Sequence, residues 1–355
     1  MIAAVYHGRQ DVRIEDVPEP SVGPGEVKIA CAFNGICGTD LKEFYAGPMF
    51  TPVEPHPLTG KTIPVILGHE FSGTVVDVGR GVDDLAPGDR VAVEPIDWCD
   101  ECEFCVRGDY NLCSKLAFHG VMTHTGGLAQ YAVLKRRTLH KLPENVSLEQ
   151  GALAEPMAVA LHGAKRAVAG GDVEPDDLIA VYGAGPIGIG VYCGLRALGF
   201  QHLVVVEPSE SRRRDLETIG AELIIDPGST DAAAEILKCT GGRGVAASVD
   251  AAGAPASLLA AVRSTRKHGR VVSVAVFEHE VPIQPNDYLF SEISITSSMA
   301  YCNDFPDVIR YLSEGHYRTD SWVDHIALAD IVEAGFERLR SQSASKILVD
   351  IGAAR

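Results

Sequence analysis

The sequence predicts an α/β protein in which a parallel, doubly wound sheet is joined to a second, mainly β domain. A glycine-rich turn at residues 183–188 lies between an apolar strand and a helix. After this turn, short apolar strands alternate with helices, which is typical of a parallel sheet with crossover helices. Before it, residues 1–155 hold short β-type segments separated by Gly and Pro, as in a small barrel or sandwich.

The glycine turn has the spacing of a dinucleotide-binding motif, Gly-x-Gly-x-x-Gly. It follows the apolar run 178–182 and precedes a helix expected over 189–198. In such a turn the first glycine, Gly183, permits the tight bend, and Gly185 lets the backbone approach a pyrophosphate. Gly188 allows close packing of helix and strand, and the helix N-terminus faces the phosphates. The pattern predicts a Rossmann nucleotide-binding domain.

An acidic residue follows the next strand. Residues 202–206 form an apolar run that ends at Glu207, about 20 residues after the glycines. A carboxylate there hydrogen-bonds the adenosine ribose and repels a 2′-phosphate, so the sequence favours NAD over NADP. Arg212, Arg213 and Arg214 keep NADP as an alternative, because an arginine can hold a 2′-phosphate. We count Arg212 among the candidate cofactor contacts.

Length and charge exclude several classes of protein. The chain has 355 residues, enough for two domains, and a formal net charge of −17. This charge argues against binding to nucleic acid or to an anionic membrane. No apolar run approaches the roughly 18 residues of a membrane span, and the N-terminus does not resemble a signal peptide. We therefore expect a cytoplasmic protein.

Four of the nine cysteines lie close together, with the spacing Cys-x2-Cys-x2-Cys-x7-Cys. Close spacing in a large chain without a signal peptide favours metal binding over disulfides. Four thiolates fill the tetrahedral shell of a zinc ion and leave no position for a substrate. The sequence therefore predicts a structural zinc site formed by Cys99, Cys102, Cys105 and Cys113.

A second set of possible metal ligands is dispersed along the chain. Cys37 lies in the glycine-flanked loop 35–40, His69 in Gly68-His69-Glu70, and Glu155 in Ala154-Glu155-Pro156. Each residue type is a common zinc ligand. A single histidine after an apolar run is more often a packed core residue, and the sequence alone does not bring these pieces together.

The chain resembles the zinc-dependent medium-chain alcohol dehydrogenases over nearly its full length. The matching pieces, in order, are the loop 35–40, Gly68-His69-Glu70, Gly88-Asp89-Arg90-Val91, the four cysteines and the glycine turn. Glu155-Pro156 resembles the polyol and diol branch of the family. The resemblance implies a GroES-like catalytic domain over 1–155, completed by 299–355, and an NAD-binding Rossmann domain over 156–298.

The resemblance also implies a catalytic zinc near Cys37, His69 and Glu155. Glu70 is implied as a direct ligand or as one that exchanges with water. With a structural zinc in the cysteine group, two zinc ions per chain are expected. Thr39 matches the hydroxyl that passes the substrate proton towards solvent. The chain departs from several relatives at the next relay position, where Lys42 replaces a histidine.

The implied activity is hydride transfer between NAD and a secondary alcohol. A catalytic zinc lowers the pKa of the alcohol hydroxyl that it binds and so eases loss of the hydride. Polyol enzymes of this branch carry an arginine before the tyrosine of a segment like Tyr301-Cys302-Asn303, whereas this chain has Ala300. Without the hydrogen-bond donors of that arginine guanidinium, a short vicinal diol or hydroxyketone, such as 2,3-butanediol or acetoin, is favoured over a long polyol.

Further contacts and alternatives remain open at this point. Ile96, Phe118 and Tyr301 are candidates for the substrate pocket, and Ile187, Val274 and Val276 for the surroundings of the nicotinamide. A homodimer or homotetramer is expected from the family. The alternatives are a sorbitol or xylitol type polyol dehydrogenase and, from another class, a non-catalytic nucleotide-binding protein that keeps the fold.

Overall fold

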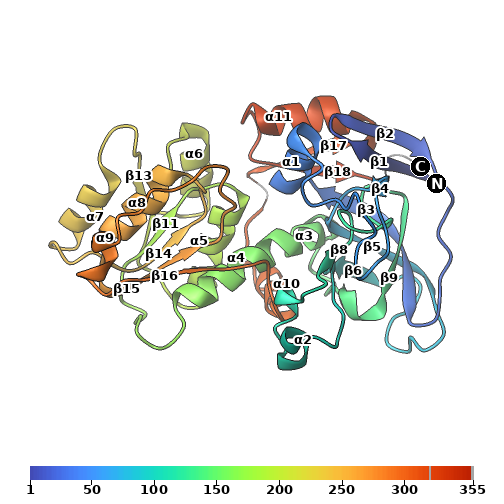
Figure 1. Cartoon of the computed structure of the whole chain (residues 1–355), viewed down its shortest axis with the longest axis horizontal. Coiled ribbons are helices and arrows are strands. Elements are labelled where there is room, and N and C mark those ends of the chain that lie inside the picture. Colours follow the sequence, from blue (N-terminus) through green and yellow to red (C-terminus); the bar gives the residue numbers. More distant parts are fainter. Residues whose placement is uncertain (320, 353–355) are drawn as a thin grey trace. The chain divides into compact units, whose positions relative to one another are not determined.

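The computed structural model describes residues 1–319 and 321–352, and the chain divides into two compact units (Figure 1). The first unit consists of Met1–Glu155, Phe305–Ser313 and Trp322–Arg355. The second consists of Pro156–Asp304 and Glu314–Ser321. Each unit has its own buried apolar core.

The sequence predicted that all of residues 299–355 would complete the first domain, and the structure differs from this for two short segments. Residues 299–304 and 314–321 belong to the second unit instead. Asp304 accepts hydrogen bonds from His162 Nδ1 and Lys165 Nζ, both at 2.8 Å, and these residues lie in the second unit. The Tyr317 hydroxyl packs beside Gly194 of the same unit. These contacts keep both short segments with the nucleotide fold.

The second unit is built on a six-stranded parallel sheet with the order β13-β12-β11-β14-β15-β16. The strand order reverses at β11 and β14, which is the arrangement that creates a nucleotide site at the carboxyl ends of these strands. The doubly wound sheet predicted from the sequence is therefore confirmed. The strands are β11 (Ile179–Tyr182), β12 (Leu203–Val206), β13 (Leu223–Ile225), β14 (Val245–Asp250), β15 (Thr265–Ser273) and β16 (Ser294–Ser297).

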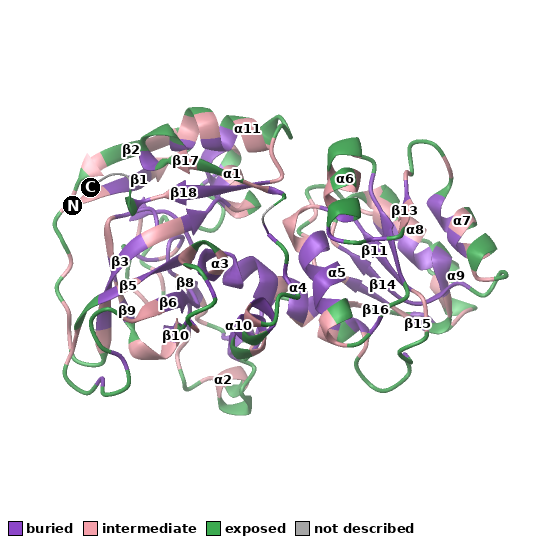
Figure 2. Ribbon diagram, turned by 180° about the vertical axis from the view of Figure 1, so that it is seen from behind, coloured by how far each residue is buried: buried purple, intermediate pink, exposed green. Residues whose placement is uncertain are grey.

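Helices cover both faces of this sheet (Figure 1). Strands β11 and β14 are buried along their whole length, as Figure 2 shows, because helices pack on either side of them. Among the described residues, no helix combines the length and apolar character of a membrane-crossing segment. The helices are α4 (Ala154–Ala167), α5 (Pro186–Ala197), α6 (Glu210–Thr218), α7 (Ala232–Cys239), α8 (Pro255–Ser264) and α9 (Asn286–Leu289).

The first unit is mainly β, as the sequence predicted. Its largest sheet has the order β10-β6-β5-β3-β18-β17, with β9 also paired to β3. A second sheet has the order β2-β1-β4, and β7 pairs with β8. The strands are β1 (Ile2–Gly8), β2 (Asp11–Asp16), β3 (Glu26–Gly35), β4 (Val65–Ile66), β5 (Glu70–Val78), β6 (Arg90–Val93), β7 (Ile96–Asp97), β8 (Ala117–Phe118), β9 (Tyr131–Lys135), β10 (Leu139–Lys141), β17 (Val323–Ala327) and β18 (Lys346–Asp350).

Short helices close the edges of these sheets and carry several candidate site residues. Helix α1 begins directly after Cys37, and α2 begins after Cys102. The helices are α1 (Gly38–Ala46), α2 (Glu103–Arg107), α3 (Leu148–Ala152), α10 (Phe305–Ser313) and α11 (Glu337–Arg340). Single 3-10 turns lie at Tyr110–Leu112, Arg136–Thr138 and Leu328–Asp330, and a short π-helix at Ile331–Phe336.

Candidate active site

Strand pairing brings together residues that are far apart in the sequence. Gly35, the last residue of β3, is paired with Glu70, the first residue of β5. Cys37 follows one strand and His69 precedes the other, so both lie at the same end of this pair. One ligand atom from each of Cys37, His69 and Glu70 lies within 4.8 Å of the others. The structure therefore joins three of the four residues expected at a catalytic metal.

Asp40 lies behind the imidazole of His69. Its carboxylate is completely buried, and one oxygen accepts a hydrogen bond of 2.9 Å from the backbone N–H of Cys37. The other oxygen is 3.6 Å from Nδ1 of His69, and within the described chain neither atom has a hydrogen-bond partner. A histidine that binds a metal through Nε2 donates its Nδ1 proton to such a carboxylate. The two orphaned atoms fit a metal-binding histidine.

The charges around His69 also fit a cation. Burial opposes a charged imidazole, yet the negative charges of Asp40 and Cys37 hold the pKa of His69 well above its usual value. Glu155 contributes in the same direction, so its carboxylate lies within electrostatic range of the ring. This excess of negative charge is what a bound divalent ion balances, and thiolate, imidazole and carboxylate suit zinc.

Glu70 and Lys346 form a buried ion pair beside this cluster. The side chain of Glu70 is 2% exposed and that of Lys346 is 3% exposed. The Lys346 ammonium also donates a hydrogen bond of 3.0 Å to the backbone carbonyl of Ile36. Lys346 therefore links β18 to the two segments that carry Cys37 and His69.

Glu155 and Thr39 occupy helix N-termini near the cluster. Glu155 is 5% exposed in the first turn of α4, but its carboxylate is not one of the three mutually close ligand atoms. Thr39 is half-buried in the first turn of α1. Lys42 lies one turn further along the same face of this helix, because residues three apart are neighbours on a helix surface. The structure thus places a hydroxyl and an amine in sequence along α1.

The four cysteines of the second group also lie together. Sγ of Cys102 is 3.5 Å from Sγ of Cys105, and the Cys99–Cys113 separation is also 3.5 Å. A tetrahedron with zinc–sulfur bonds of about 2.3 Å has sulfur–sulfur edges of about 3.8 Å. Backbone N–H groups of Cys105 and Ser114 lower the pKa of the Cys102 thiol to about 5. Burial raises the pKa of Cys105 to about 12, so the argument for a tetrathiolate zinc site rests on the compact arrangement of the four sulfur atoms.

The glycine turn lies at the carboxyl end of β11 in the second unit. Gly183 has a φ of 96°, and a Cβ there would lie 3.0–3.1 Å from Ala252. A Cβ at Gly188 would collide with the carbonyl of Gly183, whereas one at Gly185 would meet nothing within 4 Å. Contacts within the chain therefore explain why Gly183 and Gly188 must lack a side chain. Gly185 has no such contact, and it leaves the backbone open on the side where a phosphate approaches.

Glu207 is fixed beside this turn. It is 2% exposed, and its two carboxylate oxygens accept hydrogen bonds from the backbone N–H of Ala184 at 2.6 Å and of Ser209 at 2.8 Å. Of the three arginines that follow, Arg213 pairs with Asp226 and Arg214 with Glu210. Arg212 is half-buried and forms no ion pair with any described residue. Glu207 is thus held at the turn itself, whereas the Arg213 guanidinium is held by the carbonyls of Glu207 and Pro208 and by Asp226.

The residues predicted to contact the nicotinamide or the substrate differ in how far they are buried. Val274 follows β15, and its backbone N–H donates a hydrogen bond of 3.0 Å to the carbonyl of Asp250. Ile187 is half-buried and Val276 is 63% exposed. Ile96 and Phe118 are paired in β7 and β8, but Ile96 is completely buried, as is Tyr301. Phe118 is half-buried, so of these three pocket candidates it is the one whose side chain keeps some exposed surface.

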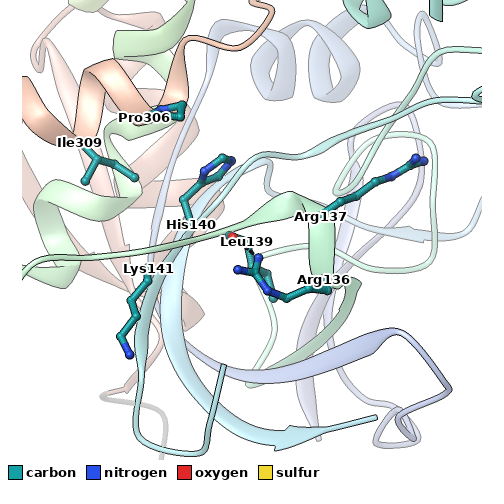
Figure 3. Close-up of a pocket in the computed structure, with 7 residues that line it drawn as sticks. All are labelled: Arg136, Arg137, Leu139, His140, Lys141, Pro306 and Ile309. Atoms are coloured by element: carbon teal, nitrogen blue, oxygen red, sulfur yellow. Dashed lines mark hydrogen bonds between the residues drawn. The ribbon is translucent and has the colours of Figure 1, made fainter. Parts of the chain in front are cut away.

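A cavity of about 490 Å³ lies apart from these groups (Figure 3). In Figure 3 the ring of His140 points towards Pro306, while Arg137 and Lys141 point in other directions. His140 is bound at 2.7 Å to the buried carboxylate of Glu94. The lining contains none of the predicted site residues: Arg136, Arg137, Leu139, His140, Lys141, Pro306 and Ile309.

Asp40 and Lys346 have roles at this site that the sequence did not indicate. Asp40 lies in the loop 35–40, and its position one helical turn after Cys37 is the only local sign of its role. Lys346 opens the apolar run Ile347–Val349, where a lysine is unexpected because a buried strand rarely begins with a charge. Its partner is 276 residues away in the sequence.

Comparison with known families covers both units. Residues 23–144 match the model of the alcohol dehydrogenase GroES-like domain, and residues 186–314 match that of the zinc-binding dehydrogenases. The (R,R)-butanediol dehydrogenase of Bacillus subtilis is 42% identical over 356 residues, covering 98% of this chain and 99% of that protein. A sorbitol dehydrogenase of Bombyx mori is 32% identical over 353 residues, covering 98% of both chains.

Solved structures agree with these relationships. The crystal structure of 2R,3R-butanediol dehydrogenase from Bacillus subtilis aligns with a TM-score of 0.92 and 41% identity over 99% of both chains. A zinc-binding dehydrogenase from Sinorhizobium meliloti bound to NADP aligns with a TM-score of 0.89 and 27% identity, over 99% of both chains. A structure from Escherichia coli, described as a short chain alcohol dehydrogenase complexed with NADH, aligns with a TM-score of 0.87 and 26% sequence identity, also over 99% of both chains.

Proposed function

The chain belongs to the zinc-dependent alcohol dehydrogenase family, and we propose that it interconverts a short vicinal diol and the corresponding hydroxyketone with NAD. The expected pair is 2,3-butanediol and acetoin. The observation that carries the proposal is the cluster of Cys37, His69 and Glu70, which has the donor set of a zinc site. The 42% identity to a butanediol dehydrogenase supports the choice of substrate.

In this proposal Cys37, His69 and Glu155 hold the catalytic zinc, and Glu70 binds it or exchanges with water. Zinc supplies a Lewis acid that polarises the reacting oxygen of the alcohol or ketone. Asp40 fixes the His69 tautomer, because its free oxygen faces Nδ1. The Thr39 hydroxyl would accept the proton of the substrate hydroxyl while it passes its own proton on towards solvent, and Lys42 is the next polar group along α1. The turn Gly183–Gly188 would hold NAD, which would supply the hydride acceptor.

A second zinc is assigned to Cys99, Cys102, Cys105 and Cys113. The sulfur separations of 3.5 Å between neighbouring thiols support this assignment. All four positions are sulfur, so the ion is structural and closed to substrate. The expected content is two zinc ions per chain.

The preference for NAD is assigned to Glu207. Its buried carboxylate is held by Ala184 and Ser209, so a 2′-phosphate at this point meets a fixed negative charge. Glu207→Ala is expected to raise the KM for NAD by roughly 10-fold to 100-fold, the effect of losing a hydrogen bond to a charged group. The same variant should lower the ratio of activity with NAD to activity with NADP, measured from initial rates with each cofactor.

Glu207→Gln is the matched control for this prediction. It keeps one oxygen that accepts a backbone N–H while removing the negative charge. If Glu207→Gln has a KM for NAD between those of wild type and Glu207→Ala, and increased activity with NADP, then the negative charge of Glu207 is what discriminates between NAD and NADP. An unchanged cofactor ratio in both variants would contradict the assignment.

The substrate is assigned from the segment that begins at Ala300. A short diol does not need the guanidinium donors that a long polyol uses, and alanine supplies none. A sorbitol or xylitol type activity is the second candidate, because a sorbitol dehydrogenase is 32% identical over 98% of the chain. The third candidate, a non-catalytic nucleotide-binding protein, conflicts with the joint presence of Cys37, His69 and Glu70 in one cluster.

A substrate panel with metal analysis on the same sample tests the proposal. Initial rates should favour 2,3-butanediol and acetoin over sorbitol and xylitol, with two zinc ions per chain. A clear preference for sorbitol would select the polyol activity. One zinc per chain without turnover of any alcohol would select the non-catalytic protein.

The expected partners are small molecules and a second copy of the chain. The net charge of −17 supports neither nucleic acid nor an anionic membrane surface as a ligand. Strand β16 lies at the edge of the parallel sheet, and Leu289, Phe290 and Ile295 near it are exposed. An open strand edge with apolar neighbours favours pairing with another copy. A homodimer or homotetramer, in the cytoplasm, is therefore our expectation.

A further inference from the structure

The segment 99–113 carries the four clustered cysteines and is called the cysteine lobe from here on. Trp98 directly precedes the lobe, and its ring is stacked on that of Tyr110, with the centroids 4.3 Å apart and an angle of 18° between the planes. Tyr110 begins the 3-10 turn that leads to Cys113. One aromatic pair therefore joins the chain just before Cys99 to the chain just before Cys113.

Arg137 adds a cation to this aromatic pair. In Figure 3 its side chain extends away from the other labelled residues. The guanidinium carbon lies 3.9 Å from the centroid of the Trp98 ring, which is a cation–π contact. The same guanidinium donates hydrogen bonds from Nη1 to Asp100 at 2.6 Å, and from Nη2 to Asp97 and to the backbone carbonyl of Trp98, both at 2.8 Å. A planar fork that stacks on a ring while it binds two carboxylates requires arginine, and lysine cannot replace it.

These contacts surround Cys99 on both sides along the chain. Asp97 and Trp98 precede it, and Asp100 follows it with a φ of 63°. Aspartate adopts this left-handed conformation more readily than most residues, yet the conformation persists only where the surroundings hold it. The side chain of Asp97 is 8% exposed, and Lys135 Nζ donates to both of its oxygens at 2.8 Å. The backbone around the first cysteine is therefore held from outside the lobe.

The support behind Arg137 lies at one edge of the large sheet, in β6 and β10. Arg137 is in the turn Arg136–Thr138 that leads into β10, and the carbonyl of Thr138 accepts a hydrogen bond of 2.8 Å from the N–H of Glu94. The carboxylate of Glu94 in turn accepts the Tyr110 hydroxyl at 2.6 Å, and this residue is 4% exposed. Both ends of the cysteine lobe are thus attached to the same part of the sheet.

We propose that Arg137 is a positioning residue for the structural zinc, which holds both ends of the cysteine lobe in place before the metal binds. The inference rests on the zinc assignment in the proposed function and deepens it. The sulfur atoms of Cys99 and Cys113 come from the two ends that Arg137 and the aromatic pair hold together, and they are 3.5 Å apart. The fold thus orders two of the four ligands without zinc, and such preorganisation strengthens binding.

Arg137→Lys tests this role, because it keeps the positive charge but loses the fork and the flat stacking surface. We expect the lobe to bind zinc roughly 10-fold to 100-fold more weakly, the usual effect of removing a group that orients metal ligands. Affinity at the catalytic site should stay at the wild-type value. Competition with a chelator measures both sites in the cobalt(II)-substituted protein, where four thiolates give a much stronger charge-transfer absorption than one.

Asp100→Asn is the second variant and isolates one ion pair. Asparagine also adopts the left-handed conformation readily, so the backbone is kept while the charge is removed. Affinity at the lobe should fall by up to about fivefold, as for a partly exposed ion pair. Added to Arg137→Lys, this change should have little further effect, because the two side chains act on the lobe through one contact.

Arg107→Lys is the matched control within the lobe. Arg107 pairs with Glu103 on α2, and the two side chains are 63% and 64% exposed. The same chemical change at this exposed pair should leave the metal affinities of both sites and the midpoint of urea unfolding at their wild-type values.

Equal affinity of wild type and Arg137→Lys for the lobe metal would overturn the inference. Equal weakening of both metal sites together with a lower urea midpoint would also overturn it, because general destabilisation would then be the cause. Initial rates with 2,3-butanediol on the same samples separate this inference from the proposed activity. Weaker metal binding by the Arg137→Lys lobe, in a protein whose wild type oxidises no alcohol, would support the role of Arg137 and refute the diol activity. Diol oxidation by a wild type whose lobe holds no zinc would support the activity and refute this inference.

Discussion

Replacing His69 with alanine is expected to abolish alcohol oxidation and to remove one of two zinc ions per chain. The imidazole supplies one of three close ligand atoms, and its Nδ1 faces the buried Asp40. Loss of several kcal/mol of charge stabilisation in the transition state corresponds to a decrease in kcat/KM of at least ~10³-fold. Initial rates and metal analysis on the same sample measure both effects.

Asp40→Asn is the graded control for this prediction. The amide can still face His69 but carries no charge, so we expect a loss of zinc affinity of about 10-fold to 100-fold with the site otherwise formed. A competition assay with a chelator measures this affinity. The zinc in the four-cysteine group should remain in both variants, and a His69→Ala protein with two zinc ions and full activity would disprove the assignment.

Replacing Lys346 with methionine is expected to cost about 3–5 kcal/mol of folding free energy, because it leaves a buried carboxylate without its partner. The pair is almost completely enclosed, with 3% exposure for Lys346 and 2% for Glu70. The variant also loses the hydrogen bond to the carbonyl of Ile36. The midpoint of urea unfolding of the first unit, followed by a probe within that unit, measures the change.

The pair between Lys141 and Asp89 provides the comparison at the surface. Its atoms are 2.6 Å apart, but the lysine side chain is 57% exposed. Lys141→Met should therefore change stability by about 1 kcal/mol or less. A Lys346→Met/Glu70→Gln double variant should recover much of the loss, because no buried charge remains unpaired. If Lys346→Met and Lys141→Met were equally stable, the buried ion pair would not contribute more to folding than the exposed one, and the prediction would be wrong.

Motifs formed by residues close in sequence could be predicted directly. The glycine turn and the four-cysteine group owe their geometry to spacing within one turn or loop, so chain connectivity alone brings their atoms together. The alternation of strands and helices likewise predicted the parallel sheet, because each strand in it carries its own apolar pattern.

Residues that depend on tertiary pairing could not be predicted from the residues themselves. Cys37 and His69 meet because Gly35 pairs with Glu70, a register that no local pattern specifies. Lys346 reaches the same site from the end of another strand. Ile96 and Tyr301, both predicted from the sequence to line a substrate pocket, are completely buried, and their contact with a substrate stays a prediction. The short segments around 299–304 and 314–321 remain with the second unit through Asp304 and Tyr317.

The pairing of β18 with β3 affects the order in which the two units can mature during synthesis. All six strands of the second unit lie between residues 179 and 297, so that sheet can form while later residues are still inside the ribosome. The first unit begins earlier in the chain, yet its sheet lacks β18, and the Lys346 ammonium, until about residue 350 has emerged. Until then β9 covers residues 26–30 of β3, but residues 33–35 of the same edge stay unpaired in the nascent N-terminal half, which is therefore the part of the chain that most needs protection from a chaperone.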